Sequence, residues 1–277
     1  MKILGISAKK QGGKNSSANY LNGLVLKREG VIHDFNMLES GELNVLTEFE
    51  DGSRDWGILD LYRKDSEFLS AAENRIFPYV KNYSFADSLK ELAVNLFELN
   101  HESVYGTDAQ KMEPIHLRWE NMPGVVTNEA LFNELHGSLC ENTKVECEDK
   151  NFRLIYHSPG PMTGREFLQF LGTEIGRRMY PSVWVNATIN KIVTEQSGLA
   201  IVTDVRFPDE VQAIKDAGGI VLRLDRRMFE DDHPSEIALD EPGYDWDNFH
   251  GVIRNQGLTL LESCKLVEEF ARHYRLI

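Results

Sequence analysis

The sequence has 277 residues, 42% of them hydrophobic, and a formal net charge of −14. Binding to a nucleic acid polymer needs a broad basic surface, which this acidity argues against, and no apolar run reaches the roughly 18 residues that cross a bilayer. The cysteines, Cys140, Cys147 and Cys264, lack zinc or disulfide spacing, and the acidic stretch around His233 is typical of a solvated loop. We expect a cytoplasmic protein without a signal peptide, a membrane contact or a dedicated metal site.

The N-terminal segment has the layout of a phosphate-binding P-loop. An apolar run at 3–7 predicts a strand, a Gly- and Lys-rich turn follows, and residues 16–27 predict a helix. Gly12 and Gly13 allow the backbone to approach phosphate oxygens, and the amides at the start of the helix attract an anion. Lys14 occupies the position of the lysine that contacts the outer phosphates. The segment therefore predicts binding of a nucleoside triphosphate, ATP.

This loop departs from the pattern G-x-x-x-x-G-K-[ST] at two positions. Ala8 replaces the first glycine, and Asn15 replaces the Ser or Thr whose hydroxyl binds Mg²⁺. The amide oxygen of Asn15, a bridging water or the Ser16 hydroxyl could take that role. The alternative interpretation is a surface turn after an edge strand. The predicted nucleotide-binding residues are Lys10, Gly12, Gly13, Lys14, Asn15 and Ser16.

Residues 30–75 differ from the rest of the chain. Short β-prone segments at 31–35, 43–49 and 56–61 are separated by Ser-Gly and Asp-Gly pairs, which predicts a β-hairpin-like insertion in a single domain over 1–277. A lone hairpin is marginal in water, so its apolar residues need a surface to cover. That surface is either the protein's own flank or a second subunit. We expect the insertion to support assembly or stability rather than chemistry, and we favour a homodimer.

The remaining segments alternate between predicted strands and predicted helices. Strands are predicted at 79–85, 199–203, 220–224 and 251–255. Helices are predicted at 86–98, 183–192, 208–217 and 258–274, and another begins at a Thr163–Glu166 capping box. Residues 104–126 are rich in loop formers. This alternation predicts an α/β fold with a doubly wound parallel sheet flanked by helices.

Charged residues near these element ends are candidates for phosphate chemistry. Asp204 follows the strand at 199–203, at the edge where α/β folds bind ligands, and Arg206 lies two residues further on. Arg165 lies beside a helix start, and its planar guanidinium suits a transferring phosphoryl group. The alternative for Asp204 and Arg206 is an ion pair that ties a loop to a helix. For any single arginine the alternative is a surface ion pair. The predicted catalytic residues are Lys14, Arg165, Asp204 and Arg206.

Another group of residues is predicted to bind a second substrate. Asp87 lies at the start of the helix at 86–98, and Lys90 is placed to face a substrate phosphate. Arg118, Trp119 and Trp184 could hold a base through cation–π and stacking contacts. For the two tryptophans the alternative is an ordinary core position.

Together these residues resemble the deoxynucleoside monophosphate kinases of large bacteriophages, within the P-loop nucleoside monophosphate kinase-like family. The matching segments, in order, are the loop at 7–17, FADSLK at 85–90, YGTDAQK at 105–111 with RWE at 118–120, REFLQFLGT at 165–173 and DVRFPDE at 204–210. VIRN at 252–255 also fits. The resemblance covers most of 1–30 and 80–277 and leaves 30–75 without a counterpart.

The resemblance implies ATP- and Mg²⁺-dependent phosphorylation of deoxynucleoside 5′-monophosphates in support of dNTP synthesis. It implies a P-loop kinase fold with a substrate-binding part and a mobile lid, which acts on small molecules in the host cytoplasm. Two alternatives remain at this stage. One is a phosphomevalonate kinase-like enzyme, which shares the loop and the Asp-x-Arg element. The other is a non-catalytic nucleotide-binding regulator or scaffold, suggested by Ala8 and Asn15.

Overall fold

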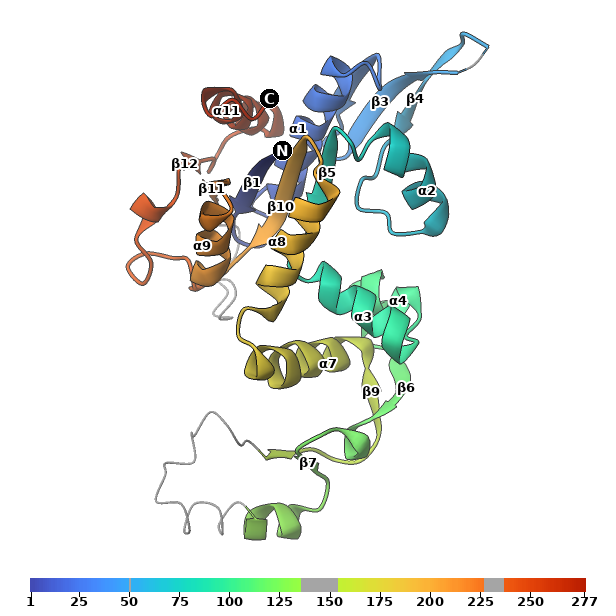
Figure 1. The fold of residues 1–277 in the computed structure, drawn as a ribbon, viewed down its shortest axis with the longest axis vertical. Coiled ribbons are helices and arrows are strands. Elements are labelled where there is room, and N and C mark those ends of the chain that lie inside the picture. The colour runs from blue at the N-terminus through green and yellow to red at the C-terminus, as the bar shows by residue number, and fades with distance from the viewer. Residues whose placement is uncertain (50, 136–153, 227–236) are drawn as a thin grey trace. The chain divides into compact units, whose positions relative to one another are not determined.

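The computed structural model describes residues 1–49, 51–135, 154–226 and 237–277 (Figure 1). Cys140, Cys147 and His233 lie outside these residues. The chain forms two compact units: unit 1 is Met1–Phe85 with Val185–Ile277, and unit 2 is Ala86–Trp184. Within the described ranges, no helix is long and apolar enough to cross a membrane. The prediction of one kinase domain over 1–277 stays a prediction.

Unit 1 is built on a five-stranded parallel sheet with the strand order β12-β11-β1-β10-β5. The strands are β1 (Lys2–Ser7), β5 (Val80–Tyr83), β10 (Leu199–Val205), β11 (Ile220–Asp225) and β12 (Gly251–Arg254). The two central strands, β1 and β10, are almost fully buried, as expected for a parallel sheet that is covered on both faces. The predicted central parallel sheet is therefore confirmed.

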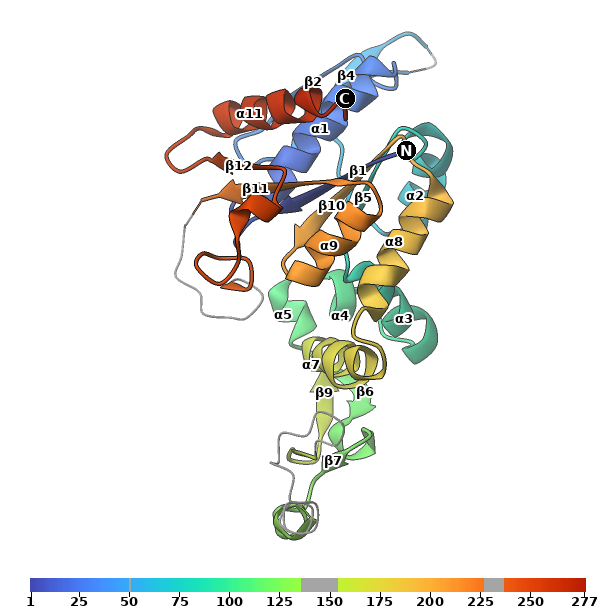
Figure 2. The same ribbon diagram turned by 60° about the vertical axis from the view of Figure 1, so that its left-hand side comes forward.

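Helices cover both faces of this sheet (Figures 1 and 2). One face carries α1 (Lys14–Arg28) and α11 (Leu260–His273), and the other carries α8 (Val183–Glu195) and α9 (Pro208–Asp216). Successive side chains of a strand point to opposite faces. For that reason Leu4 of β1 packs with the first pair of helices, whereas Ile3 packs with the second. The flanking helices predicted from the sequence are confirmed.

The β-prone segments of residues 30–75 form a small antiparallel sheet with the order β2-β3-β4. Its strands are β2 (Asp34–Met37), β3 (Leu43–Glu48) and β4 (Arg54–Ile58). A helix, α2 (Ser66–Arg75), follows and was not expected from the sequence. The carboxylate of Asp65 starts it by accepting a hydrogen bond from the amide of Phe68 at 3.1 Å.

Some apolar side chains of residues 30–75 pack against the rest of unit 1. Leu43, Val45 and Leu61 are buried in the same core cluster as α1 and the inner sheet face. Phe49, 55% exposed, and Ile58, 58% exposed, remain open to solvent in the single chain. The protein's own flank is therefore one surface that this region covers, and a role in assembly stays a prediction.

Unit 2 contains helices and short strands around a separate core. Its helices are α3 (Asp87–Phe97), α4 (His101–Tyr105), α5 (Asp108–Lys111) and α7 (Gly164–Gln169), which continues as the π-helix η2 (Phe170–Arg177). The strands β6 (Pro114–Arg118) and β9 (Pro161–Thr163) pair antiparallel, and β7 (Val125–Val126) pairs with β8 (Ile155–Tyr156). The predicted capping box at α7 is present, since the amide of Glu166 donates to Thr163 and the amide of Thr163 donates to Glu166.

Candidate functional site

The segment between β1 and α1 forms a tight loop that depends on two glycines. The amide of Gly12 donates to the carbonyl oxygen of Lys9 at 3.0 Å, and Gly13 has a φ of 93° immediately before α1. A Cβ added at Gly12 would lie 2.8 Å from the Cβ of Ala8. Both positions therefore require glycine, one for space and the other for its left-handed backbone.

The Lys14 side chain lies back over this loop. Its ammonium group donates to the carbonyl oxygen of Ala8 at 2.5 Å and to that of Lys9 at 2.9 Å. Lys14 is also the first residue of α1, where the amides at the helix start and the helix dipole attract an anion. An ammonium group and a set of backbone donors thus converge on one loop, which is an arrangement suited to phosphate groups.

The loop is braced by a network of ion pairs around the buried Arg223, which was not predicted from the sequence. Asp240 accepts from the Lys9 ammonium at 2.5 Å and from the Arg223 guanidinium at 2.8 Å. Arg223 is only 4% exposed and also donates to the Ser7 hydroxyl at 2.9 Å. The available signal was the arginine itself, a charged residue between two leucines inside strand β11. No pattern in the neighbouring sequence distinguishes Asp240, because it lies in an acidic stretch.

A second contact ties the loop to the end of β12. The side-chain amide of Asn255 donates to the carbonyl oxygen of Gly12 and to the hydroxyl of Ser263, both at 3.2 Å. Asn255 is 1% exposed. The loop is thus held through a buried side chain that also contacts α11.

Asn15 and Ser16 have different surroundings. Asn15 is exposed. Ser16 faces the turn between β2 and β3, where a Cβ added at Gly41 would overlap the Ser16 hydroxyl. The same turn is fixed by the Asn19 amide, which donates to the carbonyl oxygen of Gly41 at 3.0 Å. Asn15 is therefore the more open of the two candidate oxygen ligands.

Asp204 lies where the carboxyl ends of β5 and β10 meet. One carboxylate oxygen accepts from the Ser84 hydroxyl at 2.6 Å, and the other accepts from the amide of Phe85 at 3.0 Å. These strands are neighbours in a parallel sheet, so their carboxyl ends share the edge at which such folds bind ligands. The predicted position of Asp204 at that edge is confirmed, while its catalytic role stays a prediction.

A second carboxyl group, Glu210, is buried beside Asp204. It accepts from the amides of Arg206 at 2.7 Å and Phe207 at 3.0 Å, at the start of α9. Burial raises the pKa of Glu210 to about 8; the amide of Arg206 opposes this rise, and the negative charge of Asp204 adds to it. A group with this pKa binds a proton at neutral pH, which limits the negative charge at the sheet edge.

This pKa leads to a test by Glu210→Gln, which keeps an oxygen acceptor for the two amides. A carboxyl pKa that is higher in the folded than in the unfolded state means that the folded state binds the extra proton, so stability falls as pH rises from about 4.5 to about 8. Glutamine does not titrate, so the stability of the variant lacks this decrease with pH. We expect its melting temperature, relative to the wild type, to be higher at pH 8.5 than at pH 5.5. A constant difference between these pH values would contradict the assignment.

The two tryptophans predicted to hold a base are core residues of unit 2. Trp119 is 8% exposed and stacks on His157, with ring centroids 4.0 Å apart. Trp184 is also 8% exposed, and its indole N–H donates to the carbonyl oxygen of Gly172 at 2.9 Å. These positions match the alternative interpretation of ordinary packing. Contact of either ring with a substrate stays a prediction.

Two charged candidates of unit 2, Arg165 and Arg118, lie at its surface. Arg165 pairs with Asp108 at 2.5 Å, and Asp108 is 78% exposed, so this is a weak solvent-facing pair that an anion can replace. Arg118 pairs with Glu120 at 2.5 Å. Lys90 lies 5.2 Å from the ring centroid of Tyr105. Unit 2 thus carries cations with exchangeable partners, as an anionic substrate would require.

Other charged candidates belong to unit 1 or lie deeper in unit 2. The structure places Lys10, Lys14, Asp204 and Arg206 in unit 1, together with the glycine loop. Asp87, at the start of α3 in unit 2, is 9% exposed. The predicted site residues are therefore divided between the units, with the loop in one and the predicted acceptor residues in the other.

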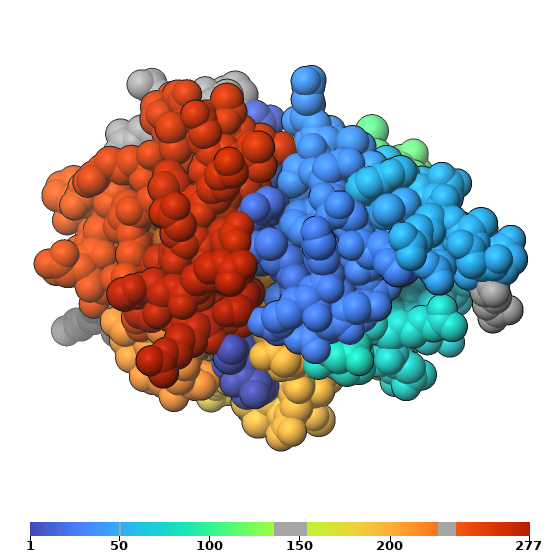
Figure 3. Space-filling model, turned by 90° about the horizontal axis from the view of Figure 1, so that it is seen from above, coloured from blue at the N-terminus to red at the C-terminus, as the bar shows by residue number. Residues whose placement is uncertain are grey.

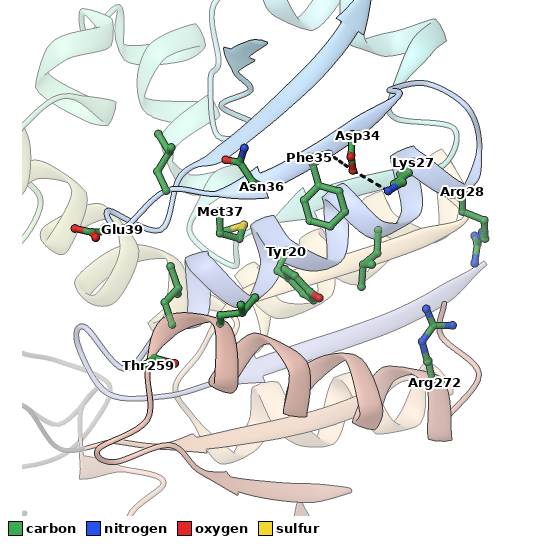
Figure 4. Close-up of a pocket in the computed structure, with 14 residues that line it drawn as sticks. Tyr20, Lys27, Arg28, Asp34, Phe35, Asn36, Met37, Glu39, Thr259 and Arg272 are labelled. Atoms are coloured by element: carbon green, nitrogen blue, oxygen red, sulfur yellow. Dashed lines mark hydrogen bonds and ion pairs between the residues drawn. The ribbon is translucent and has the colours of Figure 1, made fainter.

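Unit 1 also contains a pocket of about 940 Å³ between α1, β2 and α11 (Figures 3 and 4). Tyr20 and Phe35 meet edge to face inside it, with ring centroids 5.6 Å apart. At its rim Lys27 pairs with Asp34 at 2.7 Å. None of the predicted site residues lines this pocket.

Comparisons with known proteins agree with one another. A family model described as "Deoxynucleotide monophosphate kinase" matches residues 79–263. A protein of Acanthamoeba polyphaga mimivirus, provisionally named a deoxynucleotide monophosphate kinase, is 26% identical over 170 residues, which cover 56% of this chain and 67% of that protein. The deoxynucleoside-5′-monophosphate kinase of Escherichia phage T5 is 29% identical over 85 residues, which cover 27% of this chain and 34% of that protein.

An uncharacterized protein, ORF77 of Ictalurid herpesvirus 1 (strain Auburn), is 36% identical over 85 residues, which cover 28% of this chain and 37% of that protein. The matches thus span about two thirds of the mimivirus protein and about one third of the other two. The family range includes Arg165, Asp204 and Arg206 and begins after the glycine loop and residues 30–75.

Proposed function

This chain belongs to the deoxynucleotide monophosphate kinase family and is a phosphotransferase, and we propose that it moves the γ-phosphoryl group of ATP to a deoxynucleoside 5′-monophosphate at a site that includes the loop at 8–14. The observation that carries this proposal is the loop itself. Gly12 and Gly13 bring backbone donors together at the start of α1, and Lys14 supplies a cation at the same place. ATP phosphates need these groups.

In this proposal the loop holds the β- and γ-phosphates of ATP. Lys14 exchanges the carbonyl oxygens of Ala8 and Lys9 for phosphate oxygens, which bind an ammonium group more strongly because they are charged. The brace formed by Asp240 and Arg223 keeps the loop backbone in place during this exchange. Positioning and charge neutralisation carry most of the rate in such reactions.

We also propose that Mg²⁺ accompanies ATP. Mg²⁺ prefers oxygen ligands and retains several waters, and it is bound through one or two carboxylates together with substrate phosphates. The oxygen-bearing residues suited to this are Asp204, at the sheet edge, and Asn15, which is exposed beside Lys14. When bound, the ion would neutralise charge that develops on the phosphate oxygens.

The acceptor site is proposed to lie in unit 2, which would also include the lid. Arg165 offers a planar guanidinium to the transferring phosphoryl group, and Lys90 and Arg118 offer positive charge to the acceptor phosphate. Closure of a lid would exclude water and suppress hydrolysis of ATP. Assembly as a homodimer and a location in the host cytoplasm stay predictions.

The proposal is tested with the purified full-length chain in an assay that couples ADP release to a change in absorbance. ATP and Mg²⁺ are supplied with each of the four deoxynucleoside monophosphates in turn, and phosphomevalonate serves as the control acceptor. We expect ADP release that depends on at least one deoxynucleoside monophosphate. Release with phosphomevalonate alone, or ATP binding without release for every acceptor, would contradict the proposal.

A further inference from the structure

The pocket of about 940 Å³ in unit 1 is a groove between a strand and a helix (Figure 4). Residues 34–39, which contain β2, line one side. Residues 259–261, at the start of α11, and Arg272, near its end, line the other. The floor includes Tyr20 and Leu24 of α1. The groove therefore runs along β2, and none of these lining residues belongs to the glycine loop.

β2 is the outer strand of the β2-β3-β4 sheet, so it presents a free backbone edge to this groove. At the other edge, the amide of Leu38 donates to the carbonyl oxygen of Glu42 at 3.0 Å. Because an antiparallel ladder alternates, the backbone groups of Phe35 and Met37 point away from β3. Of these groups, the Phe35 amide donates to the Asp34 carboxylate at 2.9 Å. A free strand edge is a template for one more strand.

The surface beside this edge is mostly apolar. The rings of Phe35 and Tyr20 meet there edge to face, with centroids 5.6 Å apart. Leu24 of α1 is half-buried, and Leu261 of α11 is 51% exposed. In a sheet, residues directly opposite one another turn their side chains to the same face. In a strand paired with β2, the residues opposite Phe35 and Met37 would therefore rest on this surface and direct their backbone groups at β2.

The two ends of the groove differ in charge. Arg28 and Arg272 lie at one end, and Glu39 lies at the other (Figure 4). Arg28 contacts one carboxylate oxygen of Glu29 through Nε and Nη2, both at 2.8 Å, and Arg272 contacts Glu268 in the same way at 2.9 and 2.8 Å. Each contact uses one side of the guanidinium, and the two arginine side chains are 52% and 60% exposed. A carboxylate at this end would therefore meet two accessible guanidinium groups.

We propose that the groove binds the C-terminal segment of a partner protein, which pairs antiparallel with β2 as a fourth strand of the small sheet. β2 begins at the arginine end of the groove and leads toward Glu39. An antiparallel strand therefore ends at Arg28 and Arg272, which pair with its terminal carboxylate. It begins beside Glu39, which favours a basic residue, and every second side chain is apolar. This inference does not depend on the proposed phosphoryl transfer.

The test uses six-residue peptides that carry fluorescein on an N-terminal Gly-Gly spacer, titrated with the full-length chain by fluorescence anisotropy. Their sequence is Lys-Φ-Thr-Φ-Thr-Φ, where Φ is Val, Ile, Leu or Phe in separate peptides, so that the apolar side chains share one face. We expect saturable binding of at least one peptide, and its C-terminal amide should bind at least about tenfold more weakly. Absence of saturable binding for every peptide, or equal affinity of acid and amide, would overturn the inference.

Backbone pairing is tested by N-methylation of the peptide. Methylation at the central Φ residue removes an amide that faces β2 and should weaken binding at least about tenfold. Methylation at the threonine before it alters an amide that points away from β2 and serves as the matched control. Equal effects of the two methyl groups would contradict pairing with β2 and overturn the inference.

The position of the carboxylate is tested by combining Arg28→Glu with Arg272→Glu, which should weaken binding at least about tenfold. The matched control is Lys265→Glu, which reverses an exposed charge of α11 outside the groove and should leave the affinity unchanged. Unchanged binding to the double variant would overturn the inference. So would a wild-type dimer in sedimentation that the double variant dissociates, because a second copy of the chain then fills the groove. The proposed kinase function stands in either case.

Discussion

We expect Lys14→Ala to lower kcat by at least about a hundredfold, the scale of losing one fixed charge that stabilises the transition state. Lys14 is the first residue of α1, and its ammonium group already lies over the loop, within hydrogen-bond distance of the Ala8 and Lys9 carbonyl oxygens. Removing it leaves the phosphates of ATP without that cation. The measurement is steady-state turnover with saturating ATP and deoxynucleoside monophosphate.

The control for Lys14→Ala is Lys27→Ala, which removes a lysine from the other end of the same helix. Lys27 pairs with Asp34 at 2.7 Å, and its side chain is 49% exposed. Its loss should leave kcat near the wild-type value. A Lys14→Ala protein that melts like the wild type and also keeps near-wild-type turnover would show that the loop at 8–14 is not the phosphate site.

Arg165→Lys and Arg206→Lys should each produce a marked loss of kcat with a smaller change in ATP affinity. Lysine keeps the positive charge but loses the planar fork that contacts two phosphate oxygens at once. Arg165 is available for this contact, since its partner Asp108 is mostly exposed. Turnover and ATP binding are measured separately, by initial rates and by titration calorimetry.

Arg178→Lys provides the matched control for these two substitutions. Arg178 pairs with Glu174 four residues earlier at 3.4 Å, and the side chain of Arg178 is 32% exposed. Its replacement should change kcat by less than about twofold. Wild-type turnover in both Arg165→Lys and Arg206→Lys would assign these arginines to structural roles.

Local patterns in the sequence predicted most of the secondary structure. The buried apolar strand at 199–203, the capping box of Thr163 and Glu166, and the glycine-rich turn before α1 each depend on residues within a few positions of one another. Such features survive folding because neighbours in sequence remain neighbours in space. The exceptions include α2, where a helix follows three β-prone segments and begins at the Asp65 cap. They also include α5 and β6, which form within the stretch at 104–126 that was predicted to be rich in loop formers.

The surroundings of the candidate residues depend on the tertiary structure. The sequence singled out Trp119 and Trp184 by residue type, but burial in the core of unit 2 depends on packing partners such as His157. The same holds for Glu210, whose pKa follows from its burial and from the nearby Asp204. Residue type and spacing do not specify burial, so they could not predict either result.

The sequence by itself determined the parallel α/β architecture, the position of the glycine loop and the family resemblance. Only the tertiary structure decided what braces that loop. Arg223 meets Ser7 across 216 positions, and Asn255 meets Gly12 across 243. The physical reason is that periodicity and capping act over a few residues, whereas these contacts form only after the strands have paired and brought distant segments to one edge of the sheet.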